Sequence, residues 1–73
     1  LTQDYPELPE AHNNLAVLYA ARGDLDRARQ SLDMAIRTDP KYATAQENLG
    51  AVYIQLAARA YERAGQLDAG NRT

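Results

Sequence analysis

The chain contains no cysteine, no phenylalanine and no tryptophan, and it has a single histidine, His12. Without cysteine, neither a disulfide framework nor a thiolate metal site can stabilise the fold, and the redox compartment stays undetermined. With one histidine, a single chain cannot form a histidine pair for a metal or a histidine-based catalytic triad. The four glycines are scattered, so there is no glycine-rich phosphate loop. We therefore predict a non-enzymatic protein with no catalytic residue, no cofactor and no bound metal.

A long apolar run and a block of like charge are also missing. No apolar stretch approaches the eighteen or so residues that a membrane span needs, so we predict no membrane span. Ten acidic and eight basic side chains give a formal net charge of −2, with both signs mixed along the chain. Nucleic acid and anionic membranes require a clustered basic surface, so we predict that neither is the partner. The first residue is Leu1, and we expect a soluble piece of a longer protein.

The length limits the stability of the fold. Seventy-three residues make at most one small domain, which buries little apolar surface. Ordering such a chain costs about 1.5 kcal/mol per residue, which hydrophobic burial barely offsets. Some further source of stability is therefore expected. Alanine is the commonest residue, followed by leucine, and this composition favours closely packed helices.

The sequence contains an internal repeat. Shifting it by thirty-four positions aligns Pro6 with Pro40, Ala11 with Ala45, Asn14 with Asn48, Leu15 with Leu49 and Tyr19 with Tyr53. Beyond Tyr53 an offset of twenty-nine is needed, which aligns Ala28 with Ala57, Leu32 with Tyr61, Ala35 with Ala64 and Asp39 with Asp68. The second copy is therefore the first copy with five residues removed from its middle.

The first copy reads as a helical hairpin. Pro9 suits a first helical turn, and Gly23 can adopt the left-handed backbone that ends a helix. Asp24 can then cap a second helix, which stops before Pro40. We predict helices over about 9–21 and 24–37. Their expected apolar stripes are Ala11, Leu15, Leu18 and Tyr19 on the first, and Leu25, Ala28, Leu32, Ala35 and Ile36 on the second.

The segment HNNLAVLY, residues 12–19, resembles the W-x2-L-G-x2-Y pattern of the tetratricopeptide repeat, with His12 in the bulky slot. The segment QENLGAVY, residues 46–53, carries the same pattern with Gln46 in that slot. The thirty-four-residue period is also that of the family. The resemblance implies the tail of a preceding repeat over 1–8, a complete repeat over 9–41 and a second repeat, without its turn, over 42–73. It further suggests a bacterial multi-repeat protein, with a lean toward the cell envelope or periplasm.

The missing turn of the second copy predicts a long helix. No Gly, Pro, Asn, Asp or Ser occurs from Ile54 to Ala60, so a shortened turn there is disfavoured. An unbroken apolar stripe also runs through Leu49, Tyr53, Leu56, Ala60, Ala64 and Leu67. We predict one fused helix over about 42–68. The fold class is then all-α, a tetratricopeptide hairpin followed by one long helix.

A fused helix cannot fold back on its own first half, so we expect the stripe from Leu56 to Leu67 to be exposed. A second copy of the chain, in a two-fold or swapped arrangement, would cover it and supply the missing stability. The alternative cover is a following segment of the parent protein. The predicted self-association residues are Val52, Leu56, Ala57, Ala60, Tyr61, Ala64 and Leu67.

The resemblance also implies a groove for an extended peptide, lined by the first helices of successive repeats. The candidate groove residues are Asn13, Asn14, Val17, Ala21, Glu47, Asn48, Ala51 and Gln55. An asparagine amide offers both a donor and an acceptor to a peptide backbone, although it can equally bond within or between repeats. The second hypothesis is therefore a peptide-binding part of a longer array that is monomeric in its parent protein. RNA binding by a related repeat is disfavoured by the acidic balance.

The tyrosines on apolar stripes, Tyr19, Tyr53 and Tyr61, are predicted to lie in a core. Tyr5 and Tyr42 are expected at helix ends, partly exposed.

Overall fold

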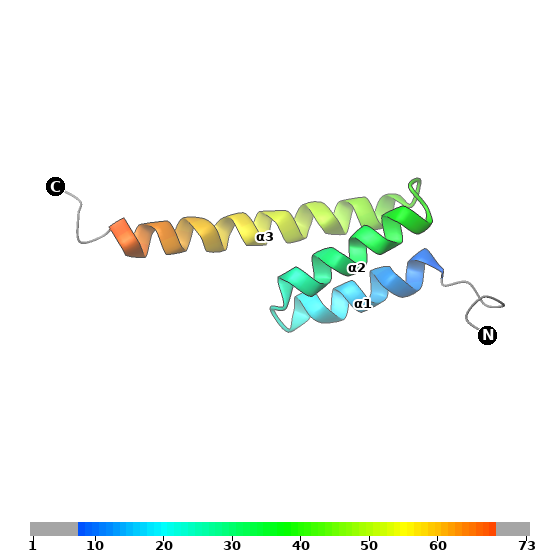
Figure 1. The fold of residues 1–73 in the computed structure, drawn as a ribbon, viewed down its shortest axis with the longest axis horizontal. Helices are drawn as coiled ribbons and strands as arrows, with labels where there is room; N and C mark the ends of the chain where they lie inside the picture. Colours follow the sequence, from blue (N-terminus) through cyan, green and yellow to red (C-terminus); the bar gives the residue numbers. More distant parts are fainter. Residues whose placement is uncertain (1–7, 69–73) are drawn as a thin grey trace.

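The computed structural model describes residues 8–68, which form three helices and no strand. These helices are α1 (Pro9–Ala21), α2 (Leu25–Thr38) and α3 (Ala43–Asp68). α1 and α2 form an antiparallel hairpin, and α3 lies alongside it and extends well beyond it (Figure 1). The predicted all-α class, the hairpin and the fused third helix are confirmed, with helix bounds that differ from the prediction by one residue at most.

The turn between α1 and α2 forms as its residues predict. Gly23 has φ +79°, the left-handed region that favours glycine. The N–H groups of Gly23 and Asp24 donate to the carbonyl oxygens of Ala20 and Tyr19, both at 2.9 Å. The Asp24 carboxylate then accepts the backbone N–H of Arg27 at 3.4 Å and caps α2. This turn reverses the chain within three residues, from Arg22 to Asp24.

Local contacts also account for the link between α2 and α3. The hydroxyl of Thr38 donates to the carbonyl oxygen of Met34 at 2.8 Å in the last turn of α2. Asp39 has an extended backbone before Pro40, as expected for a residue that precedes proline. The Asp39 carboxylate accepts the N–H of Lys41 at 3.0 Å, which closes the turn that leads into α3.

The core lies where α2 meets the other two helices. Its buried apolar residues are Ala16, Leu25, Ala28, Leu32, Ala35, Ala45 and Val52. The predicted stripe of α2 is confirmed, because four of its five residues are buried and Ile36 is half-buried. Alanine supplies much of this core, so the helices approach closely with little apolar volume between them.

The predicted face of α1 is wrong. Ala11, Leu15 and Leu18 are exposed, whereas Asn13 and Ala16 are buried, and only Tyr19 of the predicted stripe is half-buried. α2 and α3 both pack on one side of α1, and no described residue covers the other side. The periodicity therefore identified an apolar face that nothing in residues 8–68 covers.

Two tyrosine predictions are also wrong. Tyr53 is 49% exposed because it lies on a side of α3 that does not contact the hairpin. Tyr61 is 80% exposed because it lies beyond the end of the hairpin. Tyr42 is half-buried against the core, as predicted. Tyr5 lies outside the described residues.

We expect Gly23→Ala to lower the free energy of unfolding by about 1 to 2 kcal/mol, because alanine is strained at positive φ. An added Cβ would also lie 3.2 Å from Nη2 of Arg59. Gly65→Ala is the control: it lies within α3, its Cβ would meet nothing within 4 Å, and it should raise stability by about 0.5 to 1 kcal/mol. Urea unfolding followed by circular dichroism at one protein concentration checks both. Equal effects of the two substitutions would contradict the turn assignment.

Candidate protein-interaction surfaces

α3 presents two different faces. Its inner face carries Ala45, Leu49, Val52 and Leu56, at steps of four, three and four residues, and these are buried or half-buried against the hairpin. One further step of three reaches Arg59, whose Nη2 donates to the carbonyl oxygen of Gly23 at 3.0 Å. This bond joins α3 to the turn of the hairpin, at the point where the hairpin ends.

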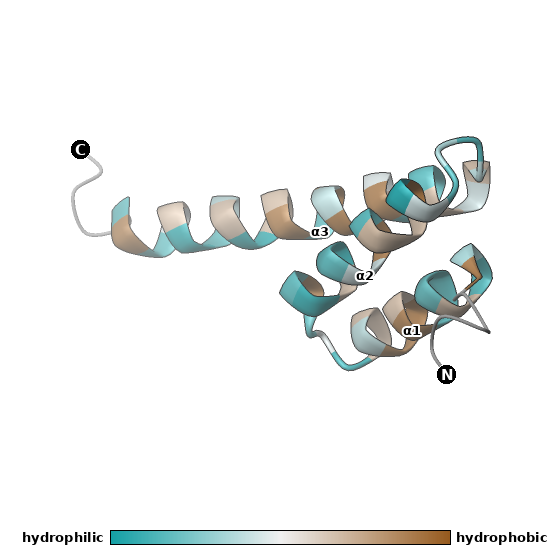
Figure 2. Ribbon diagram, turned by 45° about the vertical axis from the view of Figure 1, so that its right-hand side comes forward, coloured by the Kyte–Doolittle hydropathy of each residue, from teal (hydrophilic) through white to brown (hydrophobic). Residues whose placement is uncertain are grey.

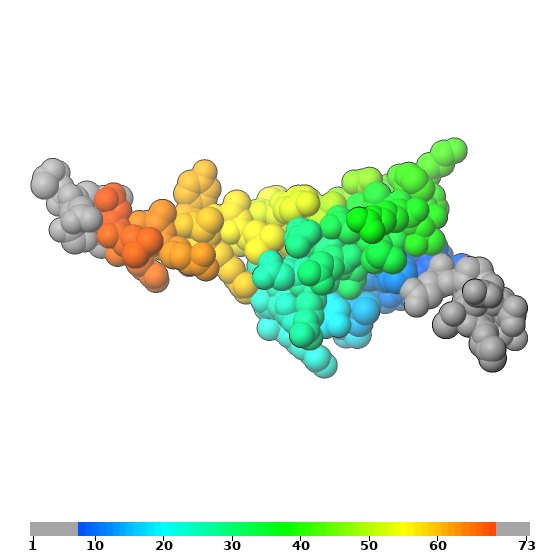
Figure 3. Space-filling model, viewed as in Figure 1, coloured from blue at the N-terminus to red at the C-terminus, as the bar shows by residue number. Residues whose placement is uncertain are grey.

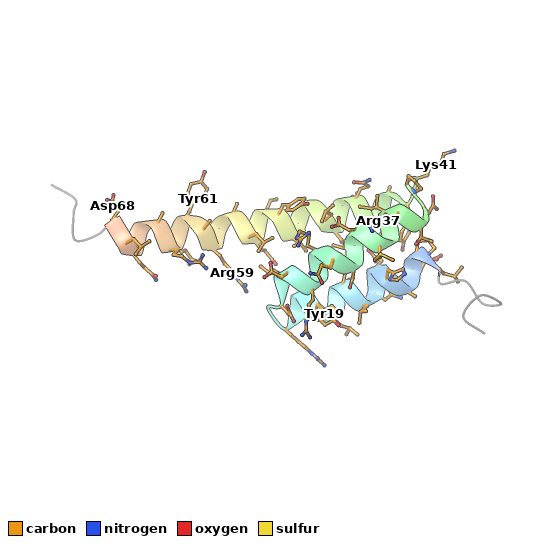
Figure 4. The ribbon with its side chains drawn as sticks, in the orientation of Figure 1. Tyr19, Arg37, Lys41, Arg59, Tyr61 and Asp68 are labelled. Carbon is orange, nitrogen blue, oxygen red and sulfur yellow. The ribbon has the colours of Figure 1, made fainter. Side chains whose placement is uncertain are left out.

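The role of Arg59 was not predicted from the sequence. The signal was present, because Arg59 lies seven residues after Val52 and seven residues bring a helix back to the same face. Reading that signal required knowing how far the hairpin reaches along α3. Figure 4 shows Arg59 pointing toward the hairpin side and Tyr61 pointing away from it.

Beyond the hairpin, α3 has no cover within the described residues. Every residue of its far half (residues 57–68) is exposed, and this segment projects alone from the body of the molecule (Figure 3). Apolar residues recur along the whole of α3, including this projecting part (Figure 2). Its exposed large apolar side chains are Tyr61, at 80%, and Leu67, at 75%.

The structure divides the predicted self-association set into two groups. Val52 is 4% exposed and belongs to the chain's own core, and Leu56 is half-buried beside it. Both lie in the near half of α3 (residues 43–56) and face the hairpin. The remaining five are exposed on the far half: Ala57, Ala60, Tyr61, Ala64 and Leu67. Ile54, which is 72% exposed, was left out of the predicted set although it lies on the same side as Tyr61.

A small cavity of about 190 Å³ lies between α1 and α3. It is lined by Ala16, Val17, Ala20, Leu32, Asn48, Ala51, Val52 and Gln55. Four of the predicted groove residues are therefore brought together there: Val17, Asn48, Ala51 and Gln55. Asn14, Ala21 and Glu47 are exposed but do not line it. The cavity is apolar, with two amide side chains among its lining residues.

Asn13 has a different environment from the other groove candidates. It is 5% exposed, and its Oδ1 accepts a hydrogen bond from Nδ2 of Asn48 at 2.9 Å. This bond joins α1 to α3 across the interface between the two repeat copies. Asn13 is thereby directed into the helix interface, and Asn48 reaches both this interface and the cavity.

Residues 8–68 hold no group of three or more His, Cys, Asp or Glu side chains able to bind a metal ion. In the same range, no helix combines the length and the apolar character needed to cross a membrane.

Two antiparallel helices joined by a glycine turn, with a third helix packed alongside them, define a helical-hairpin repeat protein. A family model described as TPR repeat matches residues 18–56, more than half of the chain. The chain belongs to the tetratricopeptide repeat family, and this supports a role in protein–protein interaction. The match ends at Leu56, next to the exposed far half of α3.

Two curated proteins of Arabidopsis thaliana are similar to the chain. Over 74 residues it is 32% identical to the chloroplastic tetratricopeptide repeat domain-containing protein PYG7, covering 94% of this chain and 25% of that protein. Over 51 residues it is 39% identical to the TPR repeat-containing thioredoxin TTL4, covering 70% of this chain and 8% of that protein. The chain thus spans a quarter or less of each relative. No solved structure matches it significantly.

Both relatives are plant proteins, so they lend no support to the bacterial assignment made from the sequence. The envelope or periplasmic location stays a prediction.

We expect Asn48→Ala to lower the free energy of unfolding by about 1 to 3 kcal/mol, because it leaves the buried Oδ1 of Asn13 without its donor. Asn14→Ala is the matched control on the exposed side of α1 and should change stability by less than about 0.5 kcal/mol. Urea unfolding of the two variants separates a role in helix packing from a purely ligand-directed one. If the two substitutions cost the same, the bond between Asn13 and Asn48 does not hold α3 on α1.

Proposed function

We propose that this chain is a non-enzymatic protein–protein interaction module that associates with a second copy of itself through α3. The observation that carries the proposal is the exposed far half of α3, with Tyr61 and Leu67 on its surface. An apolar helix face that projects into water favours association, because covering it removes apolar surface from solvent.

The repeat organisation supports the same proposal. We interpret residues 9–41 as a complete repeat, residues 42–73 as a second repeat that lacks its turn, and residues 1–8 as the tail of a preceding repeat. In a complete repeat the second helix covers the first. When the turn is missing, the near half and the far half of α3 each keep an apolar face that the other half would otherwise cover. In addition, arrays of fewer than three repeats are usually too small to be stable alone.

The formal net charge of −2 is compatible with pairing of two copies, since it produces little long-range repulsion. The far half of α3 itself has two basic and two acidic side chains, Arg59 and Arg63 with Glu62 and Asp68. This balance also supports a protein partner over nucleic acid, which attracts a clustered basic surface.

The test restores the missing turn. Inserting a copy of Arg22–Asp26 between Gln55 and Leu56 makes the period thirty-four residues throughout. The far half should then fold back on the near half, so the solution mass should fall from twice that of the 8.1 kDa chain to that of one chain. Sedimentation equilibrium at micromolar concentrations measures both masses, and circular dichroism checks that the variant stays helical.

A wild-type chain that is monomeric at these concentrations contradicts self-association. A dimer that persists after the insertion contradicts the role of the fused helix.

A second candidate function is a peptide-binding groove within a longer array. The cavity between α1 and α3 favours it, since Val17, Ala51 and the two amides of Asn48 and Gln55 meet there. An apolar cavity with a few polar groups is typical of a ligand site.

For this candidate we expect Ala51→Arg to reduce binding of extended peptides about tenfold, because a bulky charged side chain then replaces a small residue that lines the cavity, without a change in solution mass. Ala58→Arg, on an exposed part of α3 outside the cavity, is the control. An array of immobilised peptides provides the probe. Equal binding by both variants and the wild type would exclude the cavity as the peptide site.

A further inference from the structure

We propose that two copies pair antiparallel along the whole of α3, so that the far half of each packs on the near half of the other. The near half of one copy and the far half of the other then form an intermolecular helical hairpin. This replaces the intramolecular hairpin that the second repeat cannot form without its five-residue turn. The inference rests on the proposed self-association and adds the surface, the register and the position of the two-fold axis.

The surface is a second face of α3, which we call the seam. It consists of Gly50, Ile54, Ala57, Tyr61 and Ala64, at steps of four, three, four and three residues, and every one of them is exposed. This is the spacing at which one helix packs along another in a coiled coil. The seam lies about 130° around α3 from the inner face that contacts the hairpin, so the hairpin does not block it.

The internal repeat indicates what should lie on the seam. The offset of thirty-four relates Ala16 of α1 to Gly50, and the offset of twenty-nine relates Ala28 and Leu32 of α2 to Ala57 and Tyr61. In the first copy Ala16, Ala28 and Leu32 are all buried, at 1%, 0% and 1% exposure, in the packing of the hairpin. Their counterparts in the second copy are exposed, so the near half and the far half present the two sides of an interface that is not formed within the chain.

The size of the side chains fits this pairing. The bulky members of the seam, Ile54 and Tyr61, alternate with the small members, Gly50, Ala57 and Ala64. In an antiparallel pair the register that follows the first hairpin places Tyr61 against Gly50 of the second copy, and Ile54 against Ala57. At Gly50 an added Cβ would meet nothing within 4 Å, so there is open space for the tyrosine ring.

The length of α3 fits the same register. Pairing Tyr61 with Gly50 also pairs Ala43 with Asp68, which are the first and last residues of the helix. The two helices then overlap along their full length, about 39 Å at 1.5 Å per residue. Pairing of the far halves alone would overlap about 18 Å and bury too little surface for a stable interface. Tyr53 and Ala60 flank the seam on one side, whereas Leu67 lies closer to the continuation of the inner face.

The charges do not oppose this arrangement. The far half carries no net formal charge, and the near half carries one acidic side chain, Glu47.

The direction of Tyr61 is compatible with the pairing. In Figure 4 this side chain points away from the hairpin, so it is accessible to a second copy.

The experiment uses disulfide formation between copies, which is possible because the natural chain has no cysteine. A chain with both Gly50→Cys and Tyr61→Cys should form a covalent dimer on mild oxidation, since the two positions oppose each other across the two-fold axis. The control carries Ala57→Cys and Asp68→Cys, which have the same spacing of eleven residues and oppose each other only if the far halves pair alone. Non-reducing electrophoresis should show nearly complete dimer for the first chain and none for the control.

Mixing a Gly50→Cys chain with a Tyr61→Cys chain gives an independent route to the same bond, should the double substitution disturb folding. In the proposed register neither single variant links to itself. A covalent dimer in the mixture but in neither chain alone therefore supports the inference.

A covalent dimer of the control overturns the inference and leaves self-association through the far halves intact. A non-covalent dimer in which no cysteine pair links overturns the register in the same way. A monomeric wild-type chain overturns both proposals.

Discussion

The reversal of the chain at Gly23 is the constraint on which the hairpin depends. A helix can pack on the preceding helix only if the backbone leaves the right-handed region, and Gly23 does so at φ +79°. Asp24 then restarts the helical hydrogen-bond pattern through its carboxylate. The second copy of the repeat lacks the five residues that include this turn, so α3 continues straight from Ala43 to Asp68. The missing turn therefore accounts for both the length of α3 and its exposed far half.

Sequence periodicity predicted the secondary structure well, because the signals that decide it are local. Pro9, Gly23, Asp24 and Pro40 act on their immediate neighbours, and each does what its chemistry predicts. The stripe of α2 was also predicted correctly, since α2 lies between the other two helices and its apolar face is covered. For Leu15, Leu18 and Tyr61 the same kind of pattern failed. Periodicity identifies a face that favours burial, but whether another element covers that face is a tertiary property.

The candidate sites show the same limit in another way. Asn13 and Asn14 are adjacent in the sequence and both polar, yet one accepts a bond from Asn48 in a buried interface and the other faces solvent. One residue of helix is a rotation of about 100°, which is enough to exchange a packing role for an exposed one. Arg59 was missed for a related reason: its spacing from Val52 places it on the inner face of α3, but its partner, the backbone carbonyl of Gly23, depends on how far the hairpin reaches along α3. A contact to a backbone group can be predicted only when the arrangement of the helices in space is known.

A swapped pair and an ordinary hairpin use the same helix contacts, so their relative stability depends on how the two helices are connected. With a turn, the second helix meets the first within one chain, at an effective concentration that a separate molecule reaches only near millimolar levels. The intramolecular hairpin therefore prevails in a complete repeat such as the one that contains Gly23. Without the turn, the straight backbone from Ile54 to Ala60 prevents that closure, and in the proposed dimer a second copy supplies the contacts instead. In the proposed dimer, deletion of the turn removes the intramolecular competitor of association and adds no new attraction, so the seam needs no residue types beyond those of the repeat itself.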